Sequence, residues 1–163
     1  MNKIAFSHKK FDVILALNAD LPEKDFFSDF DNIPIYASDG AGILLYRKGI
    51  MPDKVIGDLD SFYGARESKE FSKDKIIRFS DQETNDFEKC LKYCRDNNYT
   101  NILIIGFHGG QLEHTLNNWS VFRRYSMQLN LCVYDKGRYG LSQHEDFYLE
   151  TRKNEIISLI PQP

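Results

Sequence analysis

Four polar clusters follow apolar, strand-like runs of the sequence, and their residue types suit the binding of a divalent cation. They are Ser38-Asp39-Gly40, Gly57-Asp58-Leu59-Asp60-Ser61, Asp81-Gln82-Glu83-Thr84-Asn85-Asp86 and Gly106-Phe107-His108-Gly109-Gly110. Since residues two apart in an extended chain point the same way, Asp58 and Asp60 are expected to project together. Two like charges at ~4 Å cost about 4 kcal/mol at an effective dielectric near 20, so a site that holds several converging aspartates almost requires a cation.

The ligand atoms that these clusters offer are hard oxygens. Carboxylates without histidine or cysteine favour Mg²⁺ or Ca²⁺. Mg²⁺ commonly shares its coordination shell with substrate phosphates, which favours a nucleotide site. The glycines in and beside the clusters allow close approach of the backbone and offer amides to anionic oxygens. The loops therefore predict a site for Mg²⁺ and the phosphates of a nucleotide.

Each cluster taken singly also has a simpler explanation. Asp39-Gly40 after a strand is typical of a turn, and Asp86 can stabilise a helix N-terminus. Asp58 and Asp60 can be solvated loop residues or helix caps, and Gly109-Gly110 a strand-to-helix turn. The metal-site hypothesis depends on the joint placement of the clusters after successive strands.

The elements that must position these clusters are strands alternating with helices. The strand-like runs are Val13–Leu17, Ile33–Ala37, Lys54–Gly57, Ile76–Phe79, Asn101–Phe107 and Leu129–Tyr134. This alternation predicts an α/β fold, a doubly wound three-layer α/β/α domain with a mostly parallel sheet, over residues 1–135. In such sheets ligands bind beyond the carboxyl ends of the strands, where the clusters lie.

Two helices between the runs are clear from the sequence. Asn85 is expected to cap a helix that begins at Asp86, with Glu88 completing a capping box. One face of this helix is apolar and consists of Phe87, Cys90, Leu91 and Cys94. A second helix is predicted from about Gln111 to Met127. Its inward face is expected to comprise Leu112, Leu116, Trp119 and Phe122.

The C-terminal segment, residues 136–163, is expected to be the start of a small β module. Phe147–Glu150 and Ile156–Ile160 flank a polar turn and predict a β-hairpin. A lone two-stranded hairpin is marginal in water. An exposed hairpin therefore favours self-association of the chain.

Composition and charge argue against several classes of protein. The formal charge is −3 at pH 7 and the basic residues are scattered, which disfavours nucleic-acid binding. No apolar stretch approaches ~20 residues, so no membrane span is expected. The three cysteines, Cys90, Cys94 and Cys132, lack zinc-ligand spacing and are interpreted as buried small hydrophobes. A reducing cytoplasm is the expected location.

The order and spacing of the clusters resemble the catalytic domain of thiamin pyrophosphokinases. The motifs are Ser38-Asp39-Gly40, Gly57-Asp58-Leu59-Asp60-Ser61, Asp81-Gln82-Glu83-x-x-Asp86 and Gly109-Gly110-x-x-x-His114-Thr115-Leu116-x-Asn118. The resemblance covers about residues 11–135, and Ile157–Pro161 is similar to the start of that family's C-terminal β-domain, which would be largely missing. It implies transfer of pyrophosphate from ATP to thiamine, giving thiamine diphosphate and AMP, by a Mg²⁺-dependent homodimer.

The resemblance also implies roles by position. The metal ligands would be Asp39, Asp58, Asp60 and Asp86, with Asp58, Asp60 and Asp86 as the catalytic residues. The ATP-binding residues would be Asp39, Gly40, Asp58, Asn85, Gly109, Gly110 and Gln111. Thiamine would contact Gln82 and Glu113.

Several positions depart from the family pattern. Ile43 stands where the family has Asn, Asn85 where it has Thr, and Gln111 where it has Arg. Glutamine cannot replace the fixed positive charge of an arginine beside phosphates. The departures keep two alternatives open. One is a pyrophosphokinase with another acceptor, such as a hydroxymethylpterin. The other is a non-catalytic domain that binds a nucleotide or thiamine diphosphate.

Overall fold

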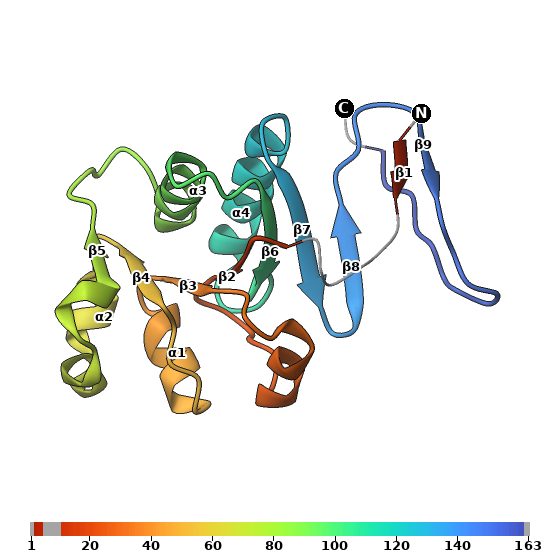
Figure 1. Ribbon diagram of the computed structural model, residues 1–163. Coiled ribbons are helices and arrows are strands. Elements are labelled where there is room, and N and C mark those ends of the chain that lie inside the picture. The colour runs from red at the N-terminus through yellow and green to blue at the C-terminus, as the bar shows by residue number, and fades with distance from the viewer. Residues whose placement is uncertain (1, 5–10, 162–163) are drawn as a thin grey trace.

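The computed structural model describes residues 2–4 and 11–161, and its centre is a seven-stranded sheet (Figure 1). The strand order is β5-β4-β3-β2-β6-β7-β8, parallel except for β8. The strands are β2 Val13–Ala16, β3 Ile35–Ser38, β4 Lys54–Gly57, β5 Ile76–Arg78, β6 Asn101–Ile105, β7 Asn130–Asp135 and β8 Arg138–Leu141. The mostly parallel α/β sheet expected from the sequence is confirmed.

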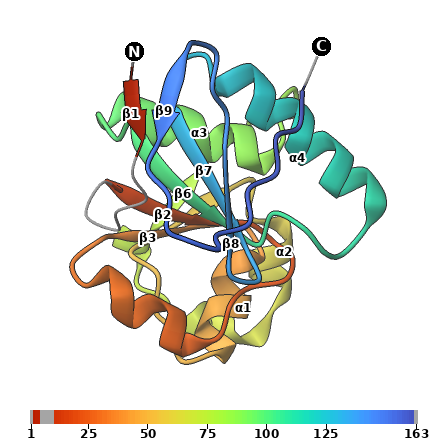
Figure 2. The same cartoon turned by 90° about the vertical axis from the view of Figure 1, so that its right-hand side faces the viewer.

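Helices cover both faces of this sheet, as Figure 2 shows. One face carries α3 (Asp86–Asp96) and α4 (Leu112–Tyr125). The other carries α1 (Ala41–Arg47), α2 (Asp60–Gly64) and the 3-10 helix η2 (Lys24–Phe30). Two further 3-10 helices, η3 (Arg66–Glu70) and η4 (Lys73–Lys75), lead into β5. Because helices cover both faces of the sheet, the domain has the three-layer α/β/α arrangement expected from the sequence.

The central strands are buried on both faces. In β2, Val13 and Leu15 pack with α3 and α4, while Ile14 and Ala16 pack with α1 and α2. Strand β6 alternates in the same way. A parallel strand covered by helices on each side must be apolar at every position, which explains the unbroken apolar runs of the sequence. The result is a rigid base beneath the loops at the carboxyl edge.

Strand β6 is shorter than expected because of Gly106. This glycine has a φ of 66°, a left-handed conformation that ends the strand at Ile105. A Cβ at Gly106 would lie 2.4 Å from the carbonyl oxygen of Leu17. Only glycine therefore allows the loops after β2 and β6 to pack this closely.

At the start of α3, only one of the two hydrogen bonds of the expected capping box is present. The side-chain oxygen of Asn85 accepts a hydrogen bond from the Glu88 backbone N–H at 2.8 Å. The Glu88 carboxylate does not reach back to Asn85. It pairs with Arg124 at 2.6 Å and accepts a hydrogen bond from the Tyr125 hydroxyl at 3.0 Å, which ties α3 to α4.

The inward face expected for α4 is confirmed at Phe122 and in part at Trp119, whose ring lies 4.8 Å from that of the buried Phe107, and is wrong at Leu112 and Leu116. Leu112 and Leu116 are 71% and 61% exposed and Trp119 is 44% exposed, whereas Val121, Phe122 and Tyr125 are buried. The N-terminal half of α4 projects away from the sheet (Figure 2), so only its C-terminal half packs against the core. Periodicity shows which side chains share a face but not how far the sheet beneath extends.

The C-terminal hairpin expected from the sequence is also wrong. Residues 147–149 form β9 (Phe147–Leu149), which pairs in parallel with β1 (Asn2–Ile4), and residues 150–161 contain no strand. Strand β8 extends the main sheet past the boundary expected at residue 135. The turn before it, Lys136-Gly137, has φ values of 46° and 80°, which suit a tight hairpin connection. Alternating apolar residues indicate a strand without identifying its partner.

The three cysteines are buried and free, as expected. Burial raises the pKa of Cys94 and of Cys132 to about 12, and it raises that of Cys90 as well. These thiols are therefore unreactive at neutral pH. In the described part of the chain no helix is both long and apolar enough to span a bilayer.

Asp12 fastens the start of β2 to the start of β6 and provides a test of the fold. Its carboxylate accepts hydrogen bonds from the backbone N–H groups of Thr100 at 2.9 Å and Asn101 at 2.8 Å. Burial raises the pKa of Asp12, but these bonds outweigh burial and hold it below 3.8. We expect Asp12→Ala to lower the free energy of unfolding by about 1 kcal/mol at pH 7, allowing for solvent screening.

The pH dependence of this loss follows from the lowered pKa. The stabilisation by ionised Asp12 is present above pH 3.8 and disappears as the pH falls through the lowered pKa. Urea unfolding should show that the difference in free energy of unfolding between wild type and Asp12→Ala is smaller at pH 3 than at pH 7. Asp146→Ala, at an exposed aspartate, is the control. An equal difference in free energy of unfolding at both pH values would contradict the stabilising role of the ionised Asp12 carboxylate.

Candidate functional site

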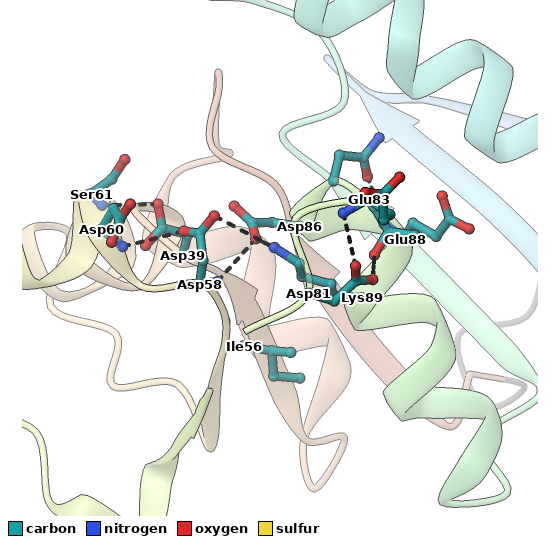
Figure 3. A network of polar contacts seen from close by, with 12 residues as sticks. Asp39, Ile56, Asp58, Asp60, Ser61, Asp81, Glu83, Asp86, Glu88 and Lys89 are labelled. Carbon is teal, nitrogen blue, oxygen red and sulfur yellow. Dashed lines mark hydrogen bonds and ion pairs between the residues drawn. The ribbon is translucent and has the colours of Figure 1, made fainter. Parts of the chain in front are cut away.

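Three aspartates from separate elements meet at the carboxyl edge of the sheet (Figure 3). Asp39 follows β3, Asp58 follows β4 and Asp86 opens α3. One carboxylate oxygen from each lies within 4.8 Å of the others. We call these three residues the aspartate cluster. The fold thus brings together three of the four expected metal ligands.

Asp39 is held in place by the start of α2. Its Oδ1 accepts a hydrogen bond from the Phe62 N–H at 2.9 Å, and its Oδ2 accepts one from the Ser61 N–H at 3.2 Å. Asp39 is 6% exposed. A carboxylate at a helix N-terminus satisfies amides that lack partners within the helix. These bonds fix the orientation of Asp39 without any ion.

The turn after β4 places the other side of the cluster. Leu59 has a φ of 72°, a left-handed conformation that is costly for a branched side chain. It is fully buried in the core beneath α1 and α2, which holds the turn in this conformation. Gly57 allows the close approach, because a Cβ there would lie 2.9 Å from Oδ1 of Asp86.

Asp60 does not join the aspartate cluster. The sequence expectation that Asp58 and Asp60 project together is wrong, because the left-handed Leu59 breaks the extended alternation between them. Asp60 becomes the first residue of α2 and is exposed beside Ser61 (Figure 3). Its backbone N–H donates to Oδ1 of Asp58 at 3.3 Å, which orients Asp58.

A buried lysine completes the site, and sequence reasoning missed it. The Lys89 ammonium lies 3.1 Å from Oδ1 of Asp86 and 3.5 Å from Oδ2 of Asp58, and its side chain is 3% exposed. The signal that could have found it is the Asp86-x-x-Lys89 spacing, since residues three apart share a helix face. A lysine on an otherwise apolar face is seldom buried without a carboxylate partner.

The charges of the site do not balance. Burial is the main cause that raises the pKa of Asp86; Lys89 opposes this shift and the nearby charge of Asp58 adds to it. Burial would lower the pKa of Lys89, but the two aspartates outweigh it and raise that pKa. Three carboxylates face one ammonium. The site retains an excess of negative charge that a divalent cation would neutralise.

The donor atoms of the cluster fit Mg²⁺ or Ca²⁺. All three are carboxylate oxygens, and none of the three cysteines or of the histidines joins them in the described residues. Hard cations prefer this set. Oxygens supplied by one edge of the sheet leave other coordination positions for water or for phosphate oxygens. The chemistry that such an arrangement supports is the binding and polarisation of a phosphate chain.

The other expected site residues lie on loops and helix starts that follow strands at the same carboxyl edge of the sheet. Gly40 is buried at the start of α1, and Asn85 is engaged in capping α3. Gln82, Gln111 and Glu113 are exposed on the loop before α3 and at the start of α4. Gly109 and Gly110 have φ values of 102° and 69° in the loop after β6.

Asp81 shapes the loop that carries Gln82. Its carboxylate accepts hydrogen bonds from the Glu83 N–H at 2.8 Å and the Thr84 hydroxyl at 2.6 Å. These bonds, the one from Thr84 first, lower the pKa of Asp81. The aspartate therefore stabilises a turn and is not a member of the cluster.

Comparison with known proteins points to one family. A sequence model of the thiamin pyrophosphokinase catalytic domain matches residues 31–133. Structures of thiamin pyrophosphokinases from Bacillus subtilis and Geobacillus thermodenitrificans share the fold, with TM-scores of 0.61 and 0.62 at 20% and 19% identity. A probable thiamine pyrophosphokinase from Staphylococcus saprophyticus has a TM-score of 0.59 at 20% identity.

The extent of these matches is partial. They cover 76%, 76% and 75% of this chain and 61%, 59% and 64% of the Bacillus, Geobacillus and Staphylococcus chains. The chain thus spans about three fifths of the length of these structures. A search among curated proteins found no match.

The unbalanced charge of the site predicts the effect of removing Lys89. Without metal, we expect Lys89→Met to lower the free energy of unfolding by about 2 kcal/mol. This loss is smaller than for a fully buried ion pair, because both aspartates are partly exposed. Mg²⁺ should then raise the melting temperature of the variant more than that of wild type, since it would replace the lost positive charge. Differential scanning calorimetry with and without Mg²⁺ measures both effects.

Lys92→Met is the matched control on the same helix. Lys92 forms an ion pair with Glu88 at 3.7 Å and is 35% exposed, so its loss should cost little. Equal destabilisation by the two substitutions, with no added response to Mg²⁺ in Lys89→Met, would show that Lys89 has no special role.

Proposed function

The chain belongs to the thiamin pyrophosphokinase family, and we propose that it transfers pyrophosphate from ATP to the hydroxyethyl group of thiamine. The products are thiamine diphosphate and AMP. The observation that carries this proposal is the aspartate cluster, with its excess negative charge at the carboxyl edge of the sheet. A site of this kind suits a metal-bound phosphate chain.

The residues proposed to hold Mg²⁺ are Asp39, Asp58 and Asp86. Bound there, Mg²⁺ would neutralise charge on the phosphates of ATP. In the reaction the thiamine hydroxyl oxygen forms a bond to the β-phosphorus, and the bond from that phosphorus to the oxygen bridging to the α-phosphate breaks. The bridging oxygen leaves with AMP, and the hydroxyl proton passes to a base. Holding the two reactants in line is the main task of the protein.

Asp60 is proposed to act from outside the cluster, as a catalytic residue that meets the metal only through a water molecule. Its carboxylate is exposed at the first turn of α2, directly beside Asp58. An exposed carboxylate at the rim of the cluster is placed to meet the metal through water or to accept the hydroxyl proton. Its exposure leaves room for a substrate, which the buried Asp39 lacks.

Lys89 is proposed to supply the fixed positive charge that the site needs. Gln111 stands where the family has arginine and carries no charge. The Lys89 ammonium already lies between Asp58 and Asp86, so it would lie beside a metal-bound phosphate chain. A lysine acts there as a point charge rather than as a two-pronged donor.

The remaining substrate contacts are proposed from the resemblance of this sequence to the family. Gly40, Asn85, Gly109, Gly110 and Gln111 are proposed to line the ATP side. Gln82, exposed on the loop before α3, and Glu113, exposed in the first turn of α4, are proposed to contact thiamine. The glycine loop after β6 offers backbone amides in left-handed conformation, a form of anion site.

The proposal extends to the assembly and the location of the protein. We propose a homodimer, because α4 leaves Leu112 and Leu116 exposed and Met127 just beyond it is 67% exposed. The catalytic domain is proposed to run through β8, with the segment after it belonging to a second β module. Three free thiols fit a cytoplasmic location. No contact with nucleic acid or membrane is proposed.

Product formation tests the proposed function. Incubation with ATP, Mg²⁺ and thiamine should give thiamine diphosphate and AMP in equal amounts by mass spectrometry, and EDTA should stop the reaction. Asp86→Asn should lower kcat about 100-fold or more, a typical loss for a group that organises charge in the reaction. Asp96→Asn, at the exposed far end of the same helix, should leave the rate unchanged.

Other outcomes separate the alternatives. ATP binding without either product would favour a non-catalytic domain, the reading that the uncharged Gln111 supports. AMP release with a hydroxymethylpterin but not with thiamine would favour another acceptor. Full activity of Asp86→Asn would contradict the role of the aspartate cluster.

A further inference from the structure

The first turns of α4 have little support from the protein around them. Nδ2 of Asn118 donates a hydrogen bond to the carbonyl oxygen of Phe107 at 3.0 Å, which places Asn118 level with the carboxyl end of β6. Residues 112–117 precede this contact, and all are exposed except the partly buried Thr115. At ~1.5 Å per residue, about 9 Å of helix projects beyond the contact (Figure 2). We call residues 112–117 the projecting segment.

Aromatic rings pack at the base of the projecting segment. The ring of Trp119 lies 4.8 Å from that of Phe107, which lies 5.8 Å from Phe122 and 6.2 Å from Phe87 at the start of α3. The hydrophobic contribution of such packing is non-directional. It therefore resists separation of α3 and α4 more than it resists a change in the angle between them.

Glu88 supplies directional bonds between the two helices. Its side chain is 13% exposed, and its two carboxylate oxygens accept hydrogen bonds from Nη2 of Arg124 at 2.6 Å and from the Tyr125 hydroxyl at 3.0 Å. Burial, and then the Glu88 carboxylate, raise the pKa of Tyr125 to about 12, so this hydroxyl remains a donor at neutral pH. Hydrogen bonds to a charged group are stronger than neutral ones. These two bonds therefore fix the angle of α4 against the first turn of α3.

The side chain of Glu88 acts away from the aspartate cluster. Lys89, the next residue, points to Asp58 and Asp86, whereas Glu88 points to α4. The bond between Asn85 and Glu88 uses the backbone N–H of Glu88, which any substitution except proline retains. A change of the Glu88 side chain thus alters the hold on α4 and leaves the cap of α3 in place.

The contacts proposed for thiamine come from both sides of this junction between helices. Gln82 lies on the loop before α3, and Glu113 lies in the first turn of α4, within the projecting segment. An acceptor held between them depends on the angle between α3 and α4. A cation does not, because α4 contributes none of Asp39, Asp58 and Asp86.

We propose that Glu88 is a positioning residue for the acceptor, which fixes the projecting segment of α4 beside the site and so sets the KM for thiamine. This inference rests on the proposed function, which makes thiamine the acceptor. It assigns to Glu88 a part in acceptor binding that is separate from the binding of the cation.

The chain carries a reporter for this test, because its one tryptophan, Trp119, lies at the base of the projecting segment and is 44% exposed. In Glu88→Ala, acrylamide should quench the Trp119 fluorescence more strongly than in wild type. The KM for thiamine should rise about tenfold, since the charge-assisted bonds that hold α4 are lost. The kcat should stay within about twofold, because the aspartate cluster is unchanged. The Kd for Mg²⁺ by isothermal titration calorimetry should also be unchanged.

Three further variants separate positioning from general loss of structure. Glu88→Gln keeps an oxygen acceptor for Tyr125 and should recover most of the KM. Tyr125→Phe removes one hydroxyl, and should raise the KM in wild type but have no further effect in Glu88→Ala. Lys92→Met is the control, because Lys92 pairs with Glu88 at 3.7 Å from α3 itself. It should leave both the quenching and the KM unchanged.

The outcomes distinguish this inference from the proposed function. An unchanged KM and unchanged quenching in both Glu88→Ala and Tyr125→Phe would overturn the positioning role even if thiamine diphosphate is formed. A joint loss of kcat and Mg²⁺ affinity would overturn it as well, since Glu88 would then order α3 as a whole. If wild type binds thiamine without forming product, a Kd for thiamine about tenfold weaker in Glu88→Ala would support the positioning role while the proposed reaction fails.

Discussion

The repulsion among three carboxylates is the constraint on which the rest of the site depends. Asp39, Asp58 and Asp86 place oxygens within 4.8 Å of one another, and one ammonium offsets them only in part. Like charges at such distances cost several kcal/mol at a protein dielectric (about 4 kcal/mol for a pair at ~4 Å). The fold must hold them together before any ion arrives, and each local feature of the edge serves that purpose.

The means of holding them are backbone groups and a rigid base. The first turn of α2 donates two N–H groups to Asp39, and the Asp58 N–H donates to Asp86. Beneath them, β2, β3, β4 and β6 are buried on both faces, so the loops cannot move apart without disturbing the core. Local strain at the left-handed Leu59 is tolerated because its side chain is fixed in that core. The three carboxylates are therefore already in position before a cation binds, and the loops do not have to fold around it.

What the sequence could and could not predict follows from the same physics. Unbroken apolar runs identified the parallel strands, and the rule on carboxyl ends then brought Asp39, Asp58 and Asp86 to one edge. Asp60 was misplaced because a single left-handed residue, Leu59, cancels the alternation of an extended chain. Lys89 was missed although Asp86 lies three residues before it on the same helix, because its second partner, Asp58, comes from another element and a helical pattern gives no sign of it. The exposed Leu112 and Leu116 and the pairing of β9 with β1 depend on the extent of neighbouring elements, which periodicity does not contain.

The central claim, that the aspartate cluster is a divalent-cation site, is tested most directly by crystallography. Crystals soaked in Mn²⁺, which takes the same oxygen ligands as Mg²⁺, would be measured for anomalous scattering. We expect one strong peak in contact with carboxylate oxygens of Asp39, Asp58 and Asp86, and its loss in Asp86→Asn crystals. A cluster without a peak, with Lys89 still paired to Asp58 and Asp86 at saturating Mn²⁺, would contradict the claim.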